Sequence, residues 1–132
     1  MINKEILSKL EHMMKCLLYT YILDKCDDLE LRNDIYELNR ITIECNKKKL
    51  TTEDWKWVKK VETKYKCNKI DVENLMEFNK RVDFKFCYSG FLSHIGFYNK
   101  DRIKDGKWIK YYESDGQIGE EENYKDGNKV GK

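Results

Sequence analysis

The chain has 132 residues, of which 38% are charged and 40% hydrophobic, and its formal net charge is +2. This length is typical of one domain, and such a small net charge excludes partner selection by overall charge alone. Five cysteines without a C-x-x-C pair favour reduced, buried thiols over a disulfide framework. Because it has no signal-peptide pattern and no apolar run of membrane-spanning length, we expect a soluble, cytoplasmic protein with no membrane partner.

Apolar residues recur at spacings of three and four in the first part of the chain, which predicts helices. The first helix is expected over residues 2–25, with a wide apolar stripe. Asp27 and Glu30 have capping-box spacing and predict a second helix that continues to about residue 46. The connection is short, so we expect these two helices to be antiparallel.

Two further helices are predicted before the pattern changes. Thr51 and Asp54 have the spacing of a helix N-cap, and a third helix begins there. A fourth helix is predicted over residues 71–81, with Met76 and Phe78 in its interior.

From residue 82 the hydrophobic period changes from 3.6 to 2, which predicts β-strands. Strands are expected at residues 82–87, 91–98, 108–113 and 117–124. Three Asp-Gly pairs, which tolerate positive φ, are expected in turns: Asp105-Gly106, Asp115-Gly116 and Asp126-Gly127. This order, with helices first and an antiparallel meander second, predicts an α+β fold. We expect a helical region of residues 1–81 and a β region of residues 82–132, packed together as one compact unit.

The end of the chain is similar to itself at an offset of 25 residues. The segments align with Asp101 on Asp126, Lys104 on Lys129, Gly106 on Gly131 and Lys107 on Lys132. A period in this range is typical of stacked repeats. This part of the chain resembles the MORN repeat, in particular the variant of bacterial antitoxin-like proteins. The resemblance lies in the order of its residues: Gly-Lys-Trp, a Tyr pair, an acidic residue and Asp-Gly, followed by Tyr-Lys-Asp-Gly.

The resemblance covers roughly the last third of the chain, from about Gly96. It implies a rigid ladder of β-hairpins that holds partner proteins, and no catalytic residue is carried over. Two or three short strands cannot bury aromatic side chains on both faces, and exposed Trp and Tyr are frequent interface anchors. We therefore predict that Trp108, Tyr112 and Tyr124 bind the partner.

A lysine-rich segment supports a different interpretation. Residues 46–70 contain nine lysines and three acidic residues, and Lys56, Lys59, Lys60 and Lys64 are expected on one face of the third helix. Lysines beside aromatic side chains can neutralise phosphates and stack bases. The simpler interpretation is a solvated helix face, and the absence of arginine here disfavours specific base recognition.

No catalytic residue, metal site or cofactor is predicted. His12 and Cys16 share a helical face, but a zinc site needs about four ligands. No basic cluster or Gly-rich elbow lies nearby to activate the thiol as a nucleophile. Phosphate-loop and dinucleotide fingerprints do not occur.

The sequence therefore predicts a non-enzymatic protein that binds and inhibits a partner enzyme. The antitoxin-like resemblance favours a toxin as that partner. The chain lacks alanine and proline, whose codons are G/C-rich, and this indicates an AT-rich genome. A phage-borne anti-defence factor, such as an anti-CRISPR that blocks a nucleic-acid-targeting defence enzyme, is the other inhibitor candidate. The alternative function is a nucleic-acid-binding module that uses the lysines of the third helix.

Overall fold

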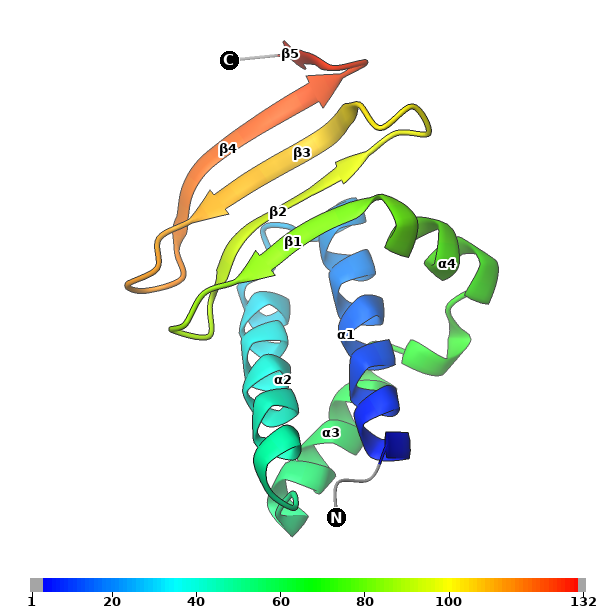
Figure 1. Cartoon of the computed structure of the whole chain (residues 1–132), viewed down its shortest axis with the longest axis vertical. Helices are drawn as coiled ribbons and strands as arrows, with labels where there is room; N and C mark the ends of the chain where they lie inside the picture. Colours follow the sequence, from blue (N-terminus) through cyan, green and yellow to red (C-terminus); the bar gives the residue numbers. More distant parts are fainter. Residues whose placement is uncertain (1–3, 131–132) are drawn as a thin grey trace. The chain divides into compact units, whose positions relative to one another are not determined.

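Helices come first in the chain and a five-stranded antiparallel sheet follows, which confirms the α+β prediction (Figure 1). The computed structural model describes residues 4–130 and divides the chain into two compact units, one up to Leu75 and one from Met76 onward. The division falls within the fourth helix. In the described part of the chain, no helix is long and apolar enough to cross a membrane.

The first unit is built on two helices, α1 (Lys4–Asp24) and α2 (Leu29–Lys47), which lie side by side (Figure 1). The N-cap of α2 is Asp28, whose side chain accepts a hydrogen bond from Leu31 N at 3.0 Å. The prediction of a capping box that starts at Asp27 is therefore wrong by one residue, because it is the carboxylate of Asp28 that reaches the first turn of α2.

The apolar stripes of these helices are buried, as their periodicity predicts. The largest fully buried side chains of α1 and α2 are Leu10, Met13, Leu17, Leu18, Tyr21, Leu31, Ile35, Leu38 and Ile41. Burial of each large apolar side chain stabilises the fold by roughly 1.5–3 kcal/mol relative to exposure.

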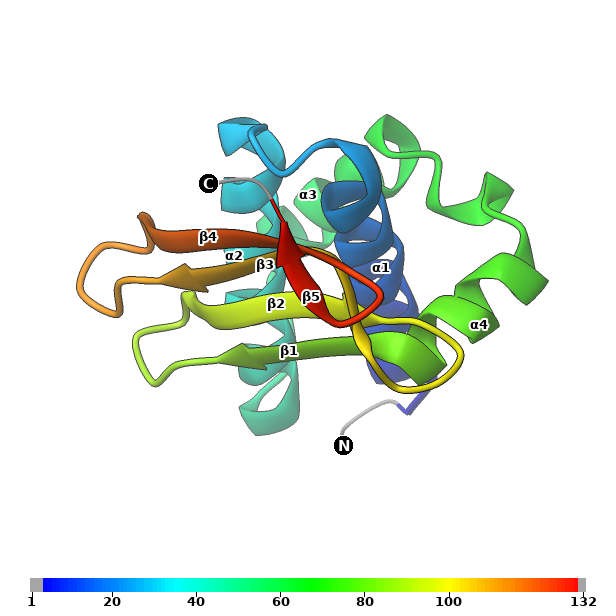
Figure 2. The same cartoon turned by 90° about the horizontal axis from the view of Figure 1, so that it is seen from above.

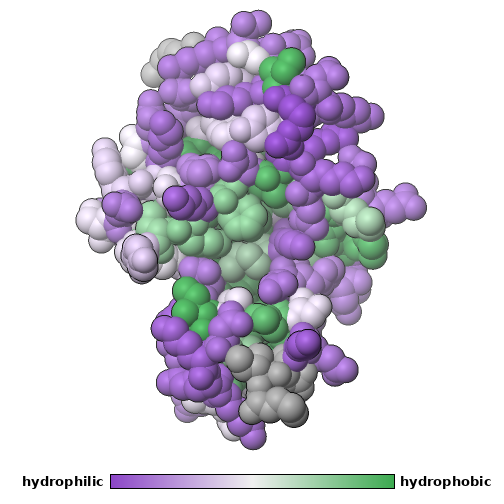
Figure 3. Space-filling model, viewed as in Figure 1, coloured by the Kyte–Doolittle hydropathy of each residue, from purple (hydrophilic) through white to green (hydrophobic). Residues whose placement is uncertain are grey.

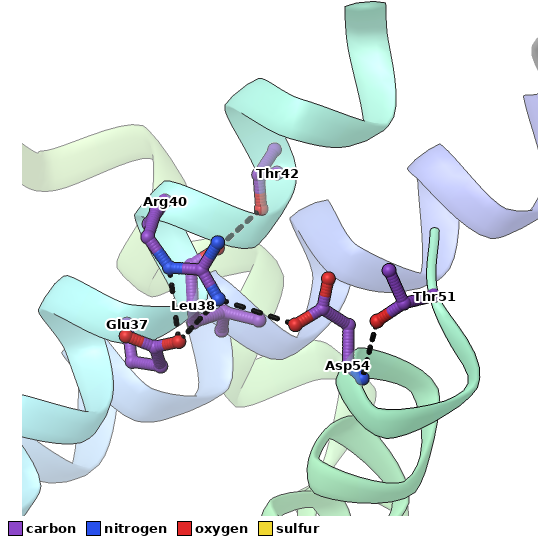
Figure 4. A network of polar contacts seen from close by, with 6 residues as sticks. All are labelled: Glu37, Leu38, Arg40, Thr42, Thr51 and Asp54. Atoms are coloured by element: carbon purple, nitrogen blue, oxygen red, sulfur yellow. Dashed lines mark hydrogen bonds and ion pairs between the residues drawn. The ribbon is translucent and has the colours of Figure 1, made fainter. Parts of the chain in front are cut away.

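The third helix, α3 (Thr52–Lys64), begins at the predicted cap. Thr51 Oγ1 accepts a hydrogen bond from Asp54 N at 3.1 Å (Figure 4). The Asp54 carboxylate in turn accepts one from Arg40 of α2 at 3.2 Å, and Arg40 also donates to Glu37. One guanidinium group thus links the N-terminus of α3 to α2.

A short 3-10 helix, η1 (Cys67–Lys69), precedes the last helix, α4 (Val72–Arg81). The Asp71 carboxylate accepts hydrogen bonds from Glu73 N and Asn74 N at 2.8 and 3.4 Å. These bonds satisfy backbone donors that have no partner within the helix, so Asp71 fixes where α4 begins.

Only one of the two predicted interior residues of α4 is buried. Phe78 is buried and stacks on Phe97 of the sheet, with ring centroids 5.6 Å apart, whereas Met76 is 57% exposed. The prediction for Met76 is wrong because each helical residue turns by about 100°. Leu75, which is also buried, shares the face of Phe78, and Met76 turns away from it.

The second unit is an antiparallel meander with the strand order β1-β2-β3-β4-β5. Its strands are β1 (Val82–Phe86), β2 (Leu92–Tyr98), β3 (Lys104–Tyr111), β4 (Ile118–Lys125) and β5 (Asn128–Val130). Alternation of apolar and polar residues predicts four of these strands. It misses β5, since three residues are too few to show a period.

The Asp-Gly pairs have two different roles. Gly116 and Gly127 have positive φ in turns, as predicted. Asp105-Gly106 lies inside β3 instead, where Gly106 has a φ of 71° and the register against β2 shifts. The prediction of a turn at this pair is wrong, because a β-bulge and a tight turn both use a residue with positive φ.

The β4–β5 turn lies against the start of β3, and Figure 2 shows this hairpin in front of β3. Gly127 N donates to Lys104 O at 3.2 Å. The β2–β3 and β4–β5 hairpins also share a pattern, because Tyr98 lies opposite Lys104 and Tyr124 lies opposite Lys129. The two lysines are 25 residues apart and the two tyrosines 26, so the hairpins share this pairing without a strict 25-residue repeat.

The cap of α3 gives a first test. Thr51→Ala should destabilise the protein by about 1 kcal/mol, because Asp54 N loses its hydrogen-bond partner at the helix start. Urea unfolding followed by circular dichroism at helical wavelengths measures the change. Thr52→Ala, one residue later, removes the same side chain without removing the cap; if both variants unfold at the same urea concentration, Thr51 is not a cap in solution.

Candidate functional site

The two faces of the sheet differ in their chemistry. Residues paired across antiparallel strands point to the same face, so the strand register assigns each side chain. Leu92, Ile95, Ile109 and Tyr111 are buried on one face. The opposite face, which we call the polar face, carries aromatic and charged side chains: Asp83, His94, Tyr98, Lys104, Trp108, Lys110, Glu120, Glu122, Tyr124 and Lys129.

Trp108 lies flat against Gly96 on the polar face. A Cβ atom on Gly96 would be 2.1 Å from Trp108 Cδ2, so the indole fills the space of a side chain at this position. Trp108 Nε1 donates a hydrogen bond to Phe97 O at 3.0 Å. Tyr98 meets the indole edge-on, with ring centroids 5.0 Å apart. Strand β2 therefore holds the indole in one orientation.

Trp108 and Tyr124 flank the ammonium group of Lys104. Lys104 Nζ lies 4.7 Å from the ring centroid of Trp108 and 5.0 Å from that of Tyr124. The Tyr124 hydroxyl donates to Glu122, and Lys129 Nζ pairs with Glu122 at 3.2 Å. These two contacts stabilise the charged carboxylate and lower the pKa of Glu122 to about 2.

A second polar network lies on the β1 side of the same face. His94 Nε2 shares a hydrogen bond with Asp83 Oδ1 at 2.8 Å, and the Tyr98 hydroxyl donates to Asp83 Oδ2 at 3.1 Å. The bond with His94 lowers the pKa of Asp83. Arg102 stacks over the Tyr98 ring at 4.7 Å. These groups pair with one another and adjoin the Trp108 side of the polar face, because Tyr98 packs on the indole and His94 lines the hollow described next.

A hollow of about 240 Å³ opens on the polar face. Its walls carry two aromatic rings, basic and acidic groups and one aliphatic side chain: Trp108, Tyr124, His94, Lys104, Lys110, Glu120, Glu122 and Ile109. The volume is below the roughly 300–1,000 Å³ of most small-molecule pockets. The hollow is therefore better matched to one side chain of a protein than to a free ligand.

One edge of β4 is uncovered beside this hollow. Strand β5 pairs only with Asn123–Lys125, so within residues 4–130 no strand adjoins 118–122 on their outer side (Figure 1). Glu120 and Glu121 are exposed, and Figure 3 shows hydrophilic residues over β4 and β5 at the top of the view. The backbone of 118–122 can therefore pair with a strand from another chain.

The structure brings together two of the three predicted partner-binding residues. Trp108 and Tyr124 line the same hollow. Tyr112 follows β3, is 57% exposed, and packs its ring on Gly119, whose Cβ position would be 3.2 Å from the ring. It lies outside the hollow.

Lys104 and Glu122 complete the surroundings of the two rings, and neither is among the predicted partner-binding residues. The sequence signal for Glu122 was its spacing from Tyr124. Glu122 and Tyr124 are two residues apart on one strand and therefore share a face. The position of Lys104 depends on the bulge at Gly106, which the sequence analysis assigned to a turn.

Among the four predicted nucleic-acid-binding lysines, Lys64 is tied to α2. Its ammonium group pairs with Glu30 and lies 3.0 Å from Asp34 Oδ2, and these contacts raise the pKa of Lys64. The Tyr65 hydroxyl donates to the same Asp34 carboxylate. Lys64 therefore links α3 to α2 and offers its charge to acidic groups of its own chain.

The other three lysines divide further. Lys59 Nζ lies 5.8 Å from the ring centroid of Trp55. Lys56 and Lys60 are exposed, and neither forms an ion pair with a described residue. Three exposed lysines of the predicted four therefore remain on α3 for phosphate contacts, one of them beside an aromatic ring, which is a small electrostatic footprint.

His12 and Cys16 lie close together on α1. The His12 Nε2 and Cys16 Sγ atoms are 3.5 Å apart, and Cys16 is fully buried. In the described part of the chain, no group of three or more His, Cys, Asp or Glu side chains could hold a metal ion. All five cysteines are free thiols.

Comparison of the chain with protein-family models, with curated proteins and with solved structures finds no match. The resemblance to the MORN repeat therefore stays a prediction, as do the roles that it implies.

The contact between Trp108 and Gly96 can be tested by a double-variant cycle. Gly96→Ala should destabilise the protein by about 1–3 kcal/mol, because the added methyl group overlaps the indole and forces it off Phe97 O. Urea unfolding measures the cost in the wild-type protein and in the Trp108→Ala variant. The cost should be much smaller in the second background. Equal costs would show that Trp108 does not lie on Gly96.

The α3 lysines give a test of the nucleic-acid alternative. Lys56→Glu/Lys60→Glu leaves the helix contacts of Lys59 and Lys64 intact. We expect the wild-type protein to bind DNA and RNA weakly, with an affinity that falls steeply as salt increases. Fluorescence anisotropy with labelled oligonucleotides measures this. Submicromolar binding at physiological salt that the folded double variant loses would favour the nucleic-acid-binding function over protein binding.

Proposed function

We propose that the chain binds another protein through the polar face of its sheet and the uncovered edge of β4. The observation that supports this is the position of Trp108 and Tyr124 at one hollow beside residues 118–122. Tryptophan and tyrosine are enriched among the residues that dominate binding energy at protein interfaces. An uncovered strand edge can accept an extended segment by main-chain hydrogen bonding.

The two features supply different parts of recognition. Main-chain pairing along a strand edge gives affinity that depends little on sequence, and a pocket beside the edge selects particular side chains. The hollow on the polar face is of the right size for such selection. Docking by strand addition would thus place alternate side chains of the partner on the polar face.

The antitoxin-like resemblance supports an inhibitory role for this binding. The partner would be an enzyme, either a toxin or a nucleic-acid-targeting defence enzyme, whose active-site segment docks on the sheet. Inhibition requires that the wild-type chain lowers the activity of the captured enzyme in proportion to complex formation. If the partner keeps full activity in the complex, the inhibitory role is excluded, although the proposal of protein binding still holds.

Binding is tested by affinity capture from the native host, followed by titration calorimetry with the purified partner. Trp108→Ala and Tyr124→Ala should each weaken binding by on the order of 1–3 kcal/mol, which is roughly 5- to 150-fold in Kd. Tyr112→Ala should have a smaller effect, because Tyr112 lies outside the hollow.

Tyr88→Ala is the matched control, since Tyr88 is a fully exposed tyrosine in the turn after β1 and not on the polar face. This variant should bind as the wild-type protein does. Circular dichroism must show that each variant is folded. If Trp108→Ala and Tyr124→Ala are folded and bind like Tyr88→Ala, the polar face is not the docking surface.

A further inference from the structure

Two of the aromatic rings on the polar face, Trp108 and Tyr124, already hold a cation from their own chain. The ammonium group of Lys104 lies 4.7 Å from the ring centroid of Trp108 and 5.0 Å from that of Tyr124. Aromatic rings attract cations placed within about 6 Å of their centroids, and pairs of rings are a recurrent way to recognise ammonium groups. The position of Lys104 Nζ therefore marks a site with affinity for a positive charge.

The side chain of Lys104 can leave this site without disturbing the sheet. Its backbone is fixed, because Lys104 pairs with Tyr98 across β2–β3 and accepts a hydrogen bond from Gly127. Its side chain is exposed and, among the described residues, forms no ion pair. Long lysine side chains are flexible, so the ammonium group can move to solvent while the strand keeps its place.

The charge of the neighbouring edge indicates which guest would replace it. The uncovered stretch of β4 ends in three consecutive glutamates, Glu120, Glu121 and Glu122, and the Glu122 carboxylate is bonded to Tyr124 at the hollow itself. Opposite charges on neighbouring strands stabilise their pairing, and like charges oppose it. Each of these glutamates already pairs with a lysine of its own chain: Glu120 with Lys110, Glu121 with Lys107 and Glu122 with Lys129. These pairs lie at the surface, where ion pairs contribute little, so a basic side chain of a docking segment can exchange with them, whereas an acidic one would be repelled.

We propose that a basic side chain of an extended partner segment enters the hollow, displaces Lys104 from between Trp108 and Tyr124, and faces Glu122. This inference rests on the proposed function, because it names the chemistry of the segment that docks on the polar face. Arginine is the better guest, since its planar guanidinium group stacks on aromatic faces and bonds carboxylates with a fixed geometry.

The test needs no knowledge of the partner. The probes are three peptides with blocked ends: threonine–arginine–threonine, the same peptide with citrulline as the neutral isostere of arginine, and the same peptide with glutamate. Each is titrated into the full chain while the indole N–H signal of Trp108 is followed by NMR. The loss of one signal in Trp108→Phe identifies it, and the signals of Trp55 and Trp57 serve as internal references.

Lys104→Met keeps most of the lysine side chain but removes the competing charge. This variant should bind the arginine peptide at least about threefold more tightly than the wild-type protein does, and more tightly than it binds the citrulline peptide. The double variant Lys104→Met/Tyr124→Ala should lose this gain in affinity for the arginine peptide. Lys60→Met, an equivalent change on α3, should behave as the wild-type protein does.

Several outcomes would overturn the inference. The inference is wrong if the arginine peptide does not shift the Trp108 signal of folded Lys104→Met. It is also wrong if the citrulline or the glutamate peptide binds as tightly as the arginine peptide does. If the Trp108→Ala and Tyr124→Ala variants still lose the captured partner, such a result rejects the basic guest and leaves the docking face in place. If those variants bind the partner normally, the docking face itself is rejected.

Discussion

The packing of the Trp108 indole on Gly96 is the contact on which the polar face depends. Because position 96 has no side chain, a ring from β3 can lie across β2 and bond Phe97 O. The indole then forms a T-shaped contact with Tyr98 and presents its face to Lys104. Any side chain larger than hydrogen at position 96 would push the ring away and remove a wall of the hollow. The shape of the polar face thus follows from one glycine.

The charges of the polar face are largely paired within the chain. Glu122 contacts Tyr124 and Lys129, and Lys104 lies against two rings. A docking protein would therefore exchange existing contacts for new ones and would gain only the difference between them. Such exchange makes affinity sensitive to the chemistry of the guest, because a poorly matched side chain leaves groups of the face without partners. The arrangement favours selectivity over tight binding.

Features that depend on neighbours along the chain were predictable from the sequence. Thr51 and Asp54 specify a helix start by their spacing, and alternation specifies most strands. Features that depend on the strand register were not predictable from the sequence. The Asp105-Gly106 pair indicates positive φ, which both a turn and a β-bulge can use. Because the pair forms a bulge and not a turn, β3 begins earlier than predicted. Lys64 illustrates the same limit, since its spacing on α3 says nothing of the acidic groups that α2 presents to it.

The open edge of β4 also bears on how the chain behaves toward copies of itself. An unpaired strand edge is a template for edge-to-edge aggregation, and natural proteins often guard such edges with charge. Two copies that approached by this edge would bring one run of three glutamates against another. The open edge is therefore poorly suited to pairing with a second copy of itself, although its backbone groups remain exposed.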